Sequence, residues 1–430
     1  MPGQGGLLQL VAHGKQDVFL TGNPQMTWFK MVYRRYTNFA IESQPMYFDG
    51  TPDFGKRITC LVPRRGDLLS QVIIEVNLPA LTLTTGDPVS YVNSIGHALI
   101  QEVTLEIGEQ QIDRQNGEWM EIWSSYTTPF DKQLGFYNMI GKMNGFVQPN
   151  IFGPQKLYIP LRFWFCRNPG LALPLIALQY HPIRINLTLR PLNQLFYSPG
   201  LATPLCNTLE ISPASITDMM LWGDYIYLDV EERRRFVSSP HEYLIEQIQY
   251  TAPLPITAGS TSATLRMEFN HPIRELFWLI QRDDMNRYHE FFNYSSAGIY
   301  ELSLTRQDIL QDAVLQLDGF DRFQVRDAGY FRLVQPWQYH KVIPSNFYTY
   351  SYSFALDPES VQPCGSLNAS RMDSIILQVN LVPSVVSQIT ALDSSGNLSS
   401  CPSPFHARIY AINHNVLRIA DGFGGVLFTI

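Results

Sequence analysis

Two stretches of the 430-residue chain, IQEVTLEIGEQQIDR (residues 100–114) and LQDAVLQLDGFDRF (residues 310–323), follow one pattern. In the first stretch, Val103, Leu105 and Ile107 alternate with polar side chains, as in a β-strand with one buried face. Similar alternation dominates the whole chain. It is typical of antiparallel sheets that have one solvated face, and it argues against a parallel sheet buried on both sides.

The similarity between the two halves extends beyond these stretches. Leu105 corresponds to Leu315, 210 residues later, and Leu187 corresponds to Val379, 192 residues later. The spacing is kept within strands and changes only in the connections, as expected for surface loops. The sequence therefore predicts one all-β domain that occurs twice.

Each copy has several short strands joined by long connections rich in Gly, Ser, Thr, Asn and Pro. This pattern predicts an all-β fold of two tandem eight-stranded antiparallel jelly-roll sandwiches with few short helices. The best helix candidate is GEWMEIWSSY (residues 117–126), where Trp119, Ile122 and Trp123 have helical spacing.

The densest charge run, Glu231–Arg235, lies near the midpoint of the chain and is followed by Pro240. A solvated connection between domains accounts for the charges, and Pro240 prevents the strand ladder from continuing. An anion site at Arg233–Arg235 is the less favoured alternative, because two glutamates lie alongside. We expect an N-terminal arm (residues 1–26), a first jelly roll (27–229), an interdomain connection (230–240) and a second jelly roll (241–430).

The composition favours a folded intracellular protein that makes no direct contact with nucleic acid. Hydrophobic residues make up 45% of the chain, and the net charge is −7. The first 22 residues carry only Lys15 and Asp17 as charged side chains, so we expect no basic arm that neutralises phosphates. We also expect no secretory signal and no transmembrane helix, since the longest apolar run, residues 169–178, is too short.

Sequence motifs give no indication of an enzyme. No His-x-His, His-Glu-x-x-His, G-x-S-x-G, G-x-G-x-x-G or P-loop motif is present, and the five cysteines lack metal-ligand spacing. We therefore expect no metal, no cofactor and no catalytic activity. A carbohydrate-active double sandwich stays open as an alternative, because the paired carboxylates of a glycosidase need no local motif.

Two further motifs have a structural and a functional interpretation. RRGD (residues 64–67) contains an Arg-Gly-Asp tripeptide, but we interpret it as the turn before a strand. Asn-x-Ser/Thr sequons occur at Asn186, Asn293, Asn368 and Asn397. Asn293 and Asn397 lie in predicted loops and are the glycan candidates.

Several long strings resemble a known family. The segment GGLLQLVAHGKQDVFLTGNPQMTWFKMVYRRYTNFAIES (5–43) resembles the N-terminal signature of the major capsid proteins of nucleocytoplasmic large DNA viruses, most of all the form in algal viruses such as the chloroviruses. Other strings similar to this family follow in order along the chain: NPGLALPLIALQYHPIRI (168–185), SPHEYLIEQIQYT (239–251), FNHP (269–272), LDGFDRF (317–323), SFALDPESVQPCGSLNASRMD (353–373) and NHNVLRIADGFGG (413–425). Segments 83–94, 284–305 and 383–403 match no such string.

The resemblance implies a structural protein. Three subunits with two jelly rolls each would form a trimeric capsomer of near-hexagonal outline, and capsomers would tile an icosahedral shell around an internal lipid membrane. The implied partners are neighbouring capsomers, minor capsid proteins, a penton protein and that membrane, with no direct nucleic acid contact. Synthesis and assembly would take place in the host cytoplasm. A minor-capsomer paralogue of the same family is the alternative.

The N-terminal arm is the predicted assembly segment. We expect its apolar side chains to lie outside both sandwiches, along the underside of the subunit, against the domain bases or the next layer inward. The candidate residues are Leu7, Leu8, Leu10, Val11, Phe19, Trp28 and Phe29.

Overall fold

The computed structural model describes residues 4–84, 89–143, 153–197, 211–298, 305–344, 346–388, 390–392, 398–402 and 404–428. The chain divides into two compact units, Met1–Asn38 and Phe39–Ile430. The first unit contains two short helices, α1 (Gln4–Val11) and α2 (Val18–Thr21). Strands begin at Phe39, whereas the sequence places the start of the first jelly roll at residue 27.

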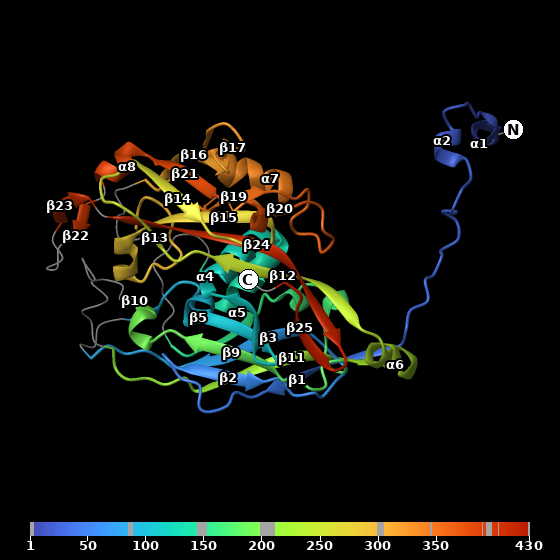
Figure 1. Cartoon of the computed structure of the whole chain (residues 1–430), viewed down its shortest axis with the longest axis horizontal. Coiled ribbons are helices and arrows are strands. Elements are labelled where there is room, and N and C mark those ends of the chain that lie inside the picture. Colours follow the sequence, from blue (N-terminus) through green and yellow to red (C-terminus); the bar gives the residue numbers. More distant parts are fainter. Residues whose placement is uncertain are drawn as a thin grey trace. The chain divides into compact units, whose positions relative to one another are not determined.

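The second unit begins with a β-sandwich (Figure 1). One of its sheets has the strand order β1-β11-β3-β7 and the other has the order β2-β9-β5-β6. In chain order, the first strand thus pairs with the eighth, the second with the seventh, the third with the sixth and the fourth with the fifth. This pairing is a jelly roll. Its strands are β1 (Phe39–Met46), β2 (Arg57–Leu61), β3 (Leu68–Leu78), β5 (Ile100–Ile107), β6 (Gln110–Gln115), β7 (Gln155–Pro160), β9 (Ile183–Leu189) and β11 (Asp218–Leu228).

A second sandwich repeats this topology. Its sheets have the orders β12-β24-β15-β19 and β14-β21-β16-β17, so the same four strand pairs recur. The strands are β12 (His241–Tyr250), β14 (Ser262–Met267), β15 (Pro272–Arg282), β16 (Leu310–Leu317), β17 (Phe320–Asp321), β19 (Tyr350–Ser353), β21 (Ile375–Leu381) and β24 (Phe405–Ala420).

Shorter elements complete the described residues. The additional strands are β4 (Ser90–Tyr91), β8 (Leu173–Pro174), β10 (Phe196–Tyr197), β13 (Leu254–Ile256), β18 (Arg326–Asp327), β20 (Leu367–Asn368), β22 (Thr390–Leu392), β23 (Leu398–Pro402) and β25 (Phe423–Val426). The helices are α3 (Ile95–Leu99), α4 (Gly117–Thr127), α5 (Phe130–Ile140), α6 (Val230–Ser238), η6 (Tyr330–Val334), α7 (Gln335–Tyr339) and α8 (Pro383–Gln388), with short 3₁₀ turns. Among the described residues, no helix has the length and apolar character that crossing a membrane requires.

The duplication extends to strand register. Leu105 lies opposite Ile185 in the first jelly roll, and its counterpart Leu315 lies opposite Leu377 in the second. A register shift follows Ile100 in β5 and recurs after Leu310 in β16, at the same offset of 210 residues. Because a slip by one residue would turn every side chain to the opposite face, such agreement requires the same pleat in both copies. The predicted fold of two tandem jelly rolls is confirmed.

The connection between the two jelly rolls contains a helix, α6. Asp229 caps its N-terminus by accepting a hydrogen bond from the Val230 N–H. Acidic residues in the first turn and Arg235 in the last turn both complement the helix dipole. No residue of α6 is buried, and Glu231, Arg234 and Arg235 are exposed to solvent.

Each jelly roll has its own apolar core between its two sheets. In the second jelly roll, the sheet containing β15 and β24 is buried on both faces. Leu276, Trp278 and Ile280 of β15 face the core of their own jelly roll, whereas Phe277 and Leu279 belong to a separate cluster on the other side. The first jelly roll covers that side.

Candidate functional site: the interface between the two jelly rolls

Helix α4 of the first jelly roll forms the apolar centre of this interface. Four of its side chains recur at helical spacing and are buried: Trp119, Ile122, Trp123 and Tyr126. They pack on residues of the second jelly roll, namely Phe277, Leu279, Tyr294, Tyr410 and Ile412. The ring of Phe277 lies edge-on to Trp119 at 5.6 Å and to Tyr126 at 5.0 Å. Aromatic pairs of this kind stabilise by about 0.5–1.5 kcal/mol beyond the area they bury.

A glycine and a cap fix the start of α4. The side chain of Asn116 accepts a hydrogen bond from the Trp119 N–H at 2.7 Å. Gly117 lies so close to the preceding helix that a Cβ atom there would be 1.9 Å from the carbonyl oxygen of His97. Only glycine permits this close approach of α4 to α3.

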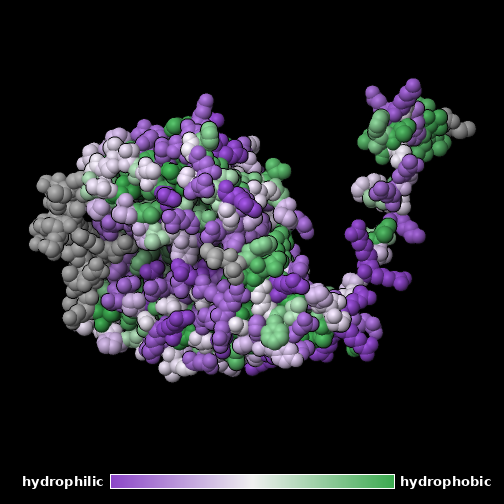
Figure 2. All heavy atoms as spheres, viewed as in Figure 1, coloured by the Kyte–Doolittle hydropathy of each residue, from purple (hydrophilic) through white to green (hydrophobic). Residues whose placement is uncertain are grey.

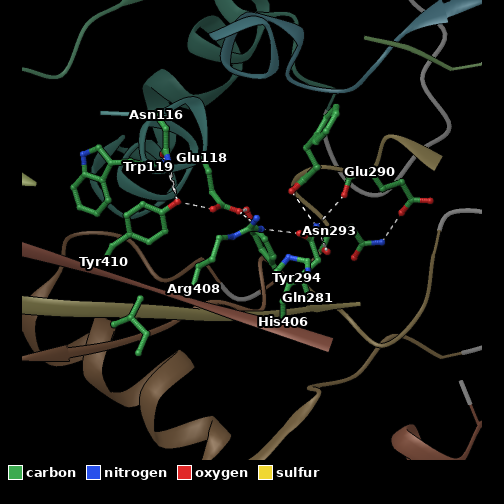
Figure 3. Close-up of polar contacts among 12 residues, drawn as sticks. Asn116, Glu118, Trp119, Gln281, Glu290, Asn293, Tyr294, His406, Arg408 and Tyr410 are labelled. Atoms are coloured by element: carbon green, nitrogen blue, oxygen red, sulfur yellow. Dashed lines mark hydrogen bonds and ion pairs between the residues drawn. The ribbon is translucent and has the colours of Figure 1, made fainter. Parts of the chain in front are cut away.

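A polar network lies beside the aromatic cluster (Figure 3). The Glu118 carboxylate accepts hydrogen bonds from Arg408 Nη2 at 2.6 Å, from the Tyr294 hydroxyl at 2.8 Å and from the Tyr410 hydroxyl. Arg408 Nη2 also donates to Gln281 Oε1 at 2.7 Å. Burial and the adjacent Glu118 charge raise the pKa of both tyrosines well above the usual range, so the hydroxyls stay protonated as donors.

His340 forms a second buried ionic contact under the same helix. Its Nε2 lies 2.6 Å from Glu275 Oε1 and its Nδ1 lies 3.2 Å from Glu359 Oε1. The Tyr126 ring of α4 packs against the imidazole at 5.0 Å. Burial disfavours the charged imidazole, but Glu275 and Glu359 outweigh this effect and raise the pKa of His340 to about 9. His340 is therefore a cation at neutral pH.

Further contacts extend the interface along the sheet. Arg167 of the first jelly roll and Arg274 of the second both form ion pairs with Glu246 on β12. Asp113 on β6 accepts a hydrogen bond from the Ile248 N–H of β12 at 3.1 Å, and burial raises its pKa to about 6.

The C-terminal strand β25 adds a contact at another edge. His181 Nδ1 lies 2.8 Å from the Gly424 carbonyl oxygen, and the Tyr180 N–H donates to the Gly422 carbonyl at 3.0 Å. The interface therefore combines an aromatic centre with ionic and backbone contacts from β6, β12, β24 and β25. Such an arrangement holds two domains rigidly.

The arm candidates belong to the first compact unit, which carries exposed hydrophobic side chains (Figure 2). The seven side chains are 64–98% exposed: Leu7, Leu8, Leu10, Val11, Phe19, Trp28 and Phe29. The predicted role of the arm in assembly stays a prediction.

The two glycan candidates have different outcomes. Asn293 is buried, and its side-chain nitrogen donates to Glu290 Oε2 at 2.6 Å and to the Ala297 carbonyl at 3.1 Å (Figure 3). This engagement is unfavourable for glycan attachment, which needs a solvent-accessible amide. Asn397 lies outside the described residues.

The Arg-Gly-Asp tripeptide has a structural role. Asp67 is buried, accepts a hydrogen bond from the Leu228 N–H at 2.9 Å and pairs with Arg233 of α6 at 2.9 Å. Arg233 is thus a partner of Asp67, which weakens the alternative of an anion site at Arg233–Arg235. Within the described residues, no group of three or more His, Cys, Asp or Glu side chains is arranged to hold a metal ion.

We predict that Arg408→Ala destabilises the chain by about 3–5 kcal/mol, because it leaves the Glu118 carboxylate buried without its cation. Urea unfolding should show this loss. The matched control is Arg234→Ala, which removes an arginine that is 75% exposed and 3.8 Å from Glu231, and should change stability by less than about 1 kcal/mol. Equal effects of the two substitutions would contradict the assigned role of Glu118–Arg408.

We predict a loss of stability at alkaline pH that depends on His340. The folded-state pKa of about 9 lies above the ordinary 6.5, so the stabilisation is complete below pH 6.5 and is lost as pH rises through 9. In urea unfolding at several pH values, wild type should lose about 3 kcal/mol more than His340→Gln over this interval. His13→Gln in the arm serves as the control. Parallel profiles of wild type and His340→Gln would refute the prediction.

Comparison with known proteins agrees with this architecture. Residues 27–229 match the family described as major capsid protein N-terminus, and residues 232–425 match large eukaryotic DNA virus major capsid protein. The chain is 35% identical to the major capsid protein of Phaeocystis pouchetii virus and 37% identical to that of Paramecium bursaria Chlorella virus 1, with 99% of each chain covered. It superposes on a chain of the quasi-atomic PBCV-1 virus capsid with a TM-score of 0.74 and 32% identity, covering 94% of this chain and 100% of that one.

These findings confirm the resemblance to algal virus capsid proteins and the expectation of a structural protein, since the relatives are named for the capsid and not for a reaction. The chain belongs to the family of major capsid proteins of large eukaryotic DNA viruses.

Proposed function

We propose that three copies of the chain associate into a capsomer of near-hexagonal outline, and that capsomers tile the icosahedral shell of a large double-stranded DNA virus. The observation that carries this proposal is the pair of equivalent jelly rolls locked side by side in one chain. Three such chains supply six similar sandwiches, which suits a hexagonal tile. Obligate interfaces of this kind commonly bury more than about 2,000 Å².

Contacts between capsomers are a separate level of assembly. They must be weaker than the contacts inside a capsomer and repeatable, so that errors in shell growth can be corrected. The proposed partners at this level are neighbouring capsomers, minor capsid proteins and a penton protein. The family resemblance supports these partners.

The exposed apolar side chains of the N-terminal arm support a role on the inner side of the shell. We propose that residues 1–26 act as an assembly arm, along the domain bases or against the next layer inward. The jelly rolls over 27–229 and 241–430 and the connection over 230–240 complete the proposed domain organisation. An internal lipid membrane is the proposed layer beneath the shell.

The net charge of −7 supports a shell protein that does not contact the genome, because binding to phosphates requires clustered cations. We propose synthesis and assembly in the host cytoplasm. Of the two glycan candidates, Asn397 is preferred over Asn293, whose amide is already engaged. A minor-capsomer paralogue is the alternative to the main shell protein, and the abundance of the chain in purified particles separates these two roles.

We predict that deletion of residues 1–25 leaves a folded trimer but impairs shell assembly, because the arm and the two jelly rolls belong to different compact units. Sedimentation should give a mass close to three times that of one chain, 49.1 kDa for the full-length protein. Electron microscopy of the same preparations should show fewer closed shells than for wild type.

Deletion of residues 1–3 is the matched control, since it removes none of the seven arm candidates. An unfolded protein, or unimpaired shell formation after deletion of residues 1–25, would overturn the proposed role of the arm. A monomeric full-length protein would overturn the capsomer itself.

A further inference from the structure

Each jelly roll carries a helical segment between its fifth and sixth strands. In the first jelly roll this segment includes α4, and in the second it is formed by η6 and α7, residues 330–339. Met120 of α4 and Phe331 of η6 are both fully buried in the core of their own jelly roll. Aligning these two residues superimposes WMEIWSSY (119–126) on YFRLVQPW (330–337).

This alignment pairs the interface residues of α4 with apolar residues of the second segment. The pairs are Trp119 with Tyr330, Ile122 with Leu333, Trp123 with Val334, and Tyr126 with Trp337. The alignment also pairs Glu121 with Arg332. Each of these two residues forms an ion pair within its own jelly roll. The two segments therefore have the same inward and outward faces.

The two outward faces differ in what covers them. In α4 all four side chains are buried against the second jelly roll. In the second segment Leu333 is 37% exposed, Val334 39% and Trp337 71%. A tryptophan and two aliphatic side chains at helical spacing on a surface indicate a contact that the single chain leaves unfilled.

The sheet face of the second jelly roll that receives α4 also has a counterpart in the first jelly roll. Helix α4 packs on Phe277 of β15, which lies opposite Tyr410 of β24. Strand β3 has a β-bulge at Ser70, which has no opposite residue in the register with β11, and β15 has one at Arg274 in its register with β24. Aligning the two bulges relates β3 to β15 by an offset of 204 residues.

By this alignment Phe277 corresponds to Ile73 of β3, and Tyr410 corresponds to Trp222 of β11, which lies opposite Ile73. Both side chains are only partly buried in the single chain. The outer face of the first jelly roll thus offers an apolar pair at the position where the second jelly roll receives α4.

We propose that residues 330–339 of one copy pack on the outer face of β3 and β11 of a second copy, and so repeat between chains the contact that α4 makes within a chain. This proposal rests on the proposed capsomer and names its interface. The contact joins two different surfaces, so it is heterologous and adds copies head to tail. With two jelly rolls per chain, a ring of six equivalent contacts closes at three copies.

Trp337 is the central anchor of this contact. It is the most exposed of the four paired residues and takes the place of Tyr126, which is fully buried in the intrachain interface. Tryptophan is enriched among residues whose truncation weakens interfaces most. The receiving Trp222 donates from Nε1 to Glu75 Oε2 at 2.8 Å, which holds its indole in place on the face.

The first test compares Trp337→Ala with Phe320→Ala in the full chain by sedimentation at several concentrations. Phe320 is an aromatic side chain of the same jelly roll that is 79% exposed and lies outside the proposed contact. Trp337→Ala should weaken trimer formation roughly 30-fold or more, with an unchanged thermal unfolding midpoint of the monomer, and Phe320→Ala should leave the trimer intact.

A second test applies if Trp337→Ala fails to fold. The pair Trp337→Cys and Ile73→Cys should form disulfides between chains on oxidation, giving cross-linked products that end at three chains, whereas neither single variant should. A trimer that Trp337→Ala leaves unchanged, together with no cross-link, overturns this interface but leaves the capsomer standing. A wild-type chain that stays monomeric overturns the capsomer.

Discussion

The packing of α4 on the outer face of β15 and β24 is the contact on which the rest of the architecture depends. An isolated jelly roll needs to bury only the inner faces of its two sheets. Here β15 and β24 are buried on both faces, because Phe277 and Tyr410 receive the aromatic side chains of α4. The two jelly rolls consequently form one continuous packed unit and have a fixed separation and tilt. A shell subunit requires this rigidity, since each copy must present its contact surfaces at the same angles.

The polar contacts around this centre specify how the two jelly rolls fit. Glu118 reaches three donors of the second jelly roll, and a shifted arrangement would leave its carboxylate buried without them. The ion pairs of His340 with Glu275 and Glu359 lie within the second jelly roll, and the ring of His340 contacts that of Tyr126 in the first. Buried ion pairs add little net stability compared with apolar packing, but a misplaced one is costly. We infer that Glu118 and its three donors select a single relative orientation, while the aromatic cluster supplies most of the stabilisation.

Much of the fold can be predicted from the sequence, because strand patterns are local. The alternation around Leu105 and Leu315 identifies the repeated strand, and the register of both copies agrees with that alignment. The helix over residues 117–126 is also predictable, since its apolar spacing lies within one segment. The α6 helix is harder to predict, because its charge run equally suits an irregular solvated connection. Its cap, Asp229, was the available signal.

The candidate site is less predictable, since its residues are far apart in the chain. Glu118 and Arg408 are separated by 290 residues, and no local pattern connects them. Asn293 illustrates the converse problem. Its sequon lies in a segment that the sequence predicts to be a surface loop, yet the amide is buried beside Glu290. The arm residues are exposed, and their predicted packing along the underside of the subunit stays a prediction.

The internal duplication gives the single chain a template for its own assembly. One copy of the helix-on-sheet contact is completed within the chain, and the parts of a second copy lie unfilled on its surface. Electron cryomicroscopy of assembled particles tests this most directly. We expect six β-sandwiches at equal separations around each capsomer, with residues 330–339 of one chain packed on β3 and β11 of the next. Capsomers in which another protein separates the chains, or in which Trp337 faces solvent, would contradict it.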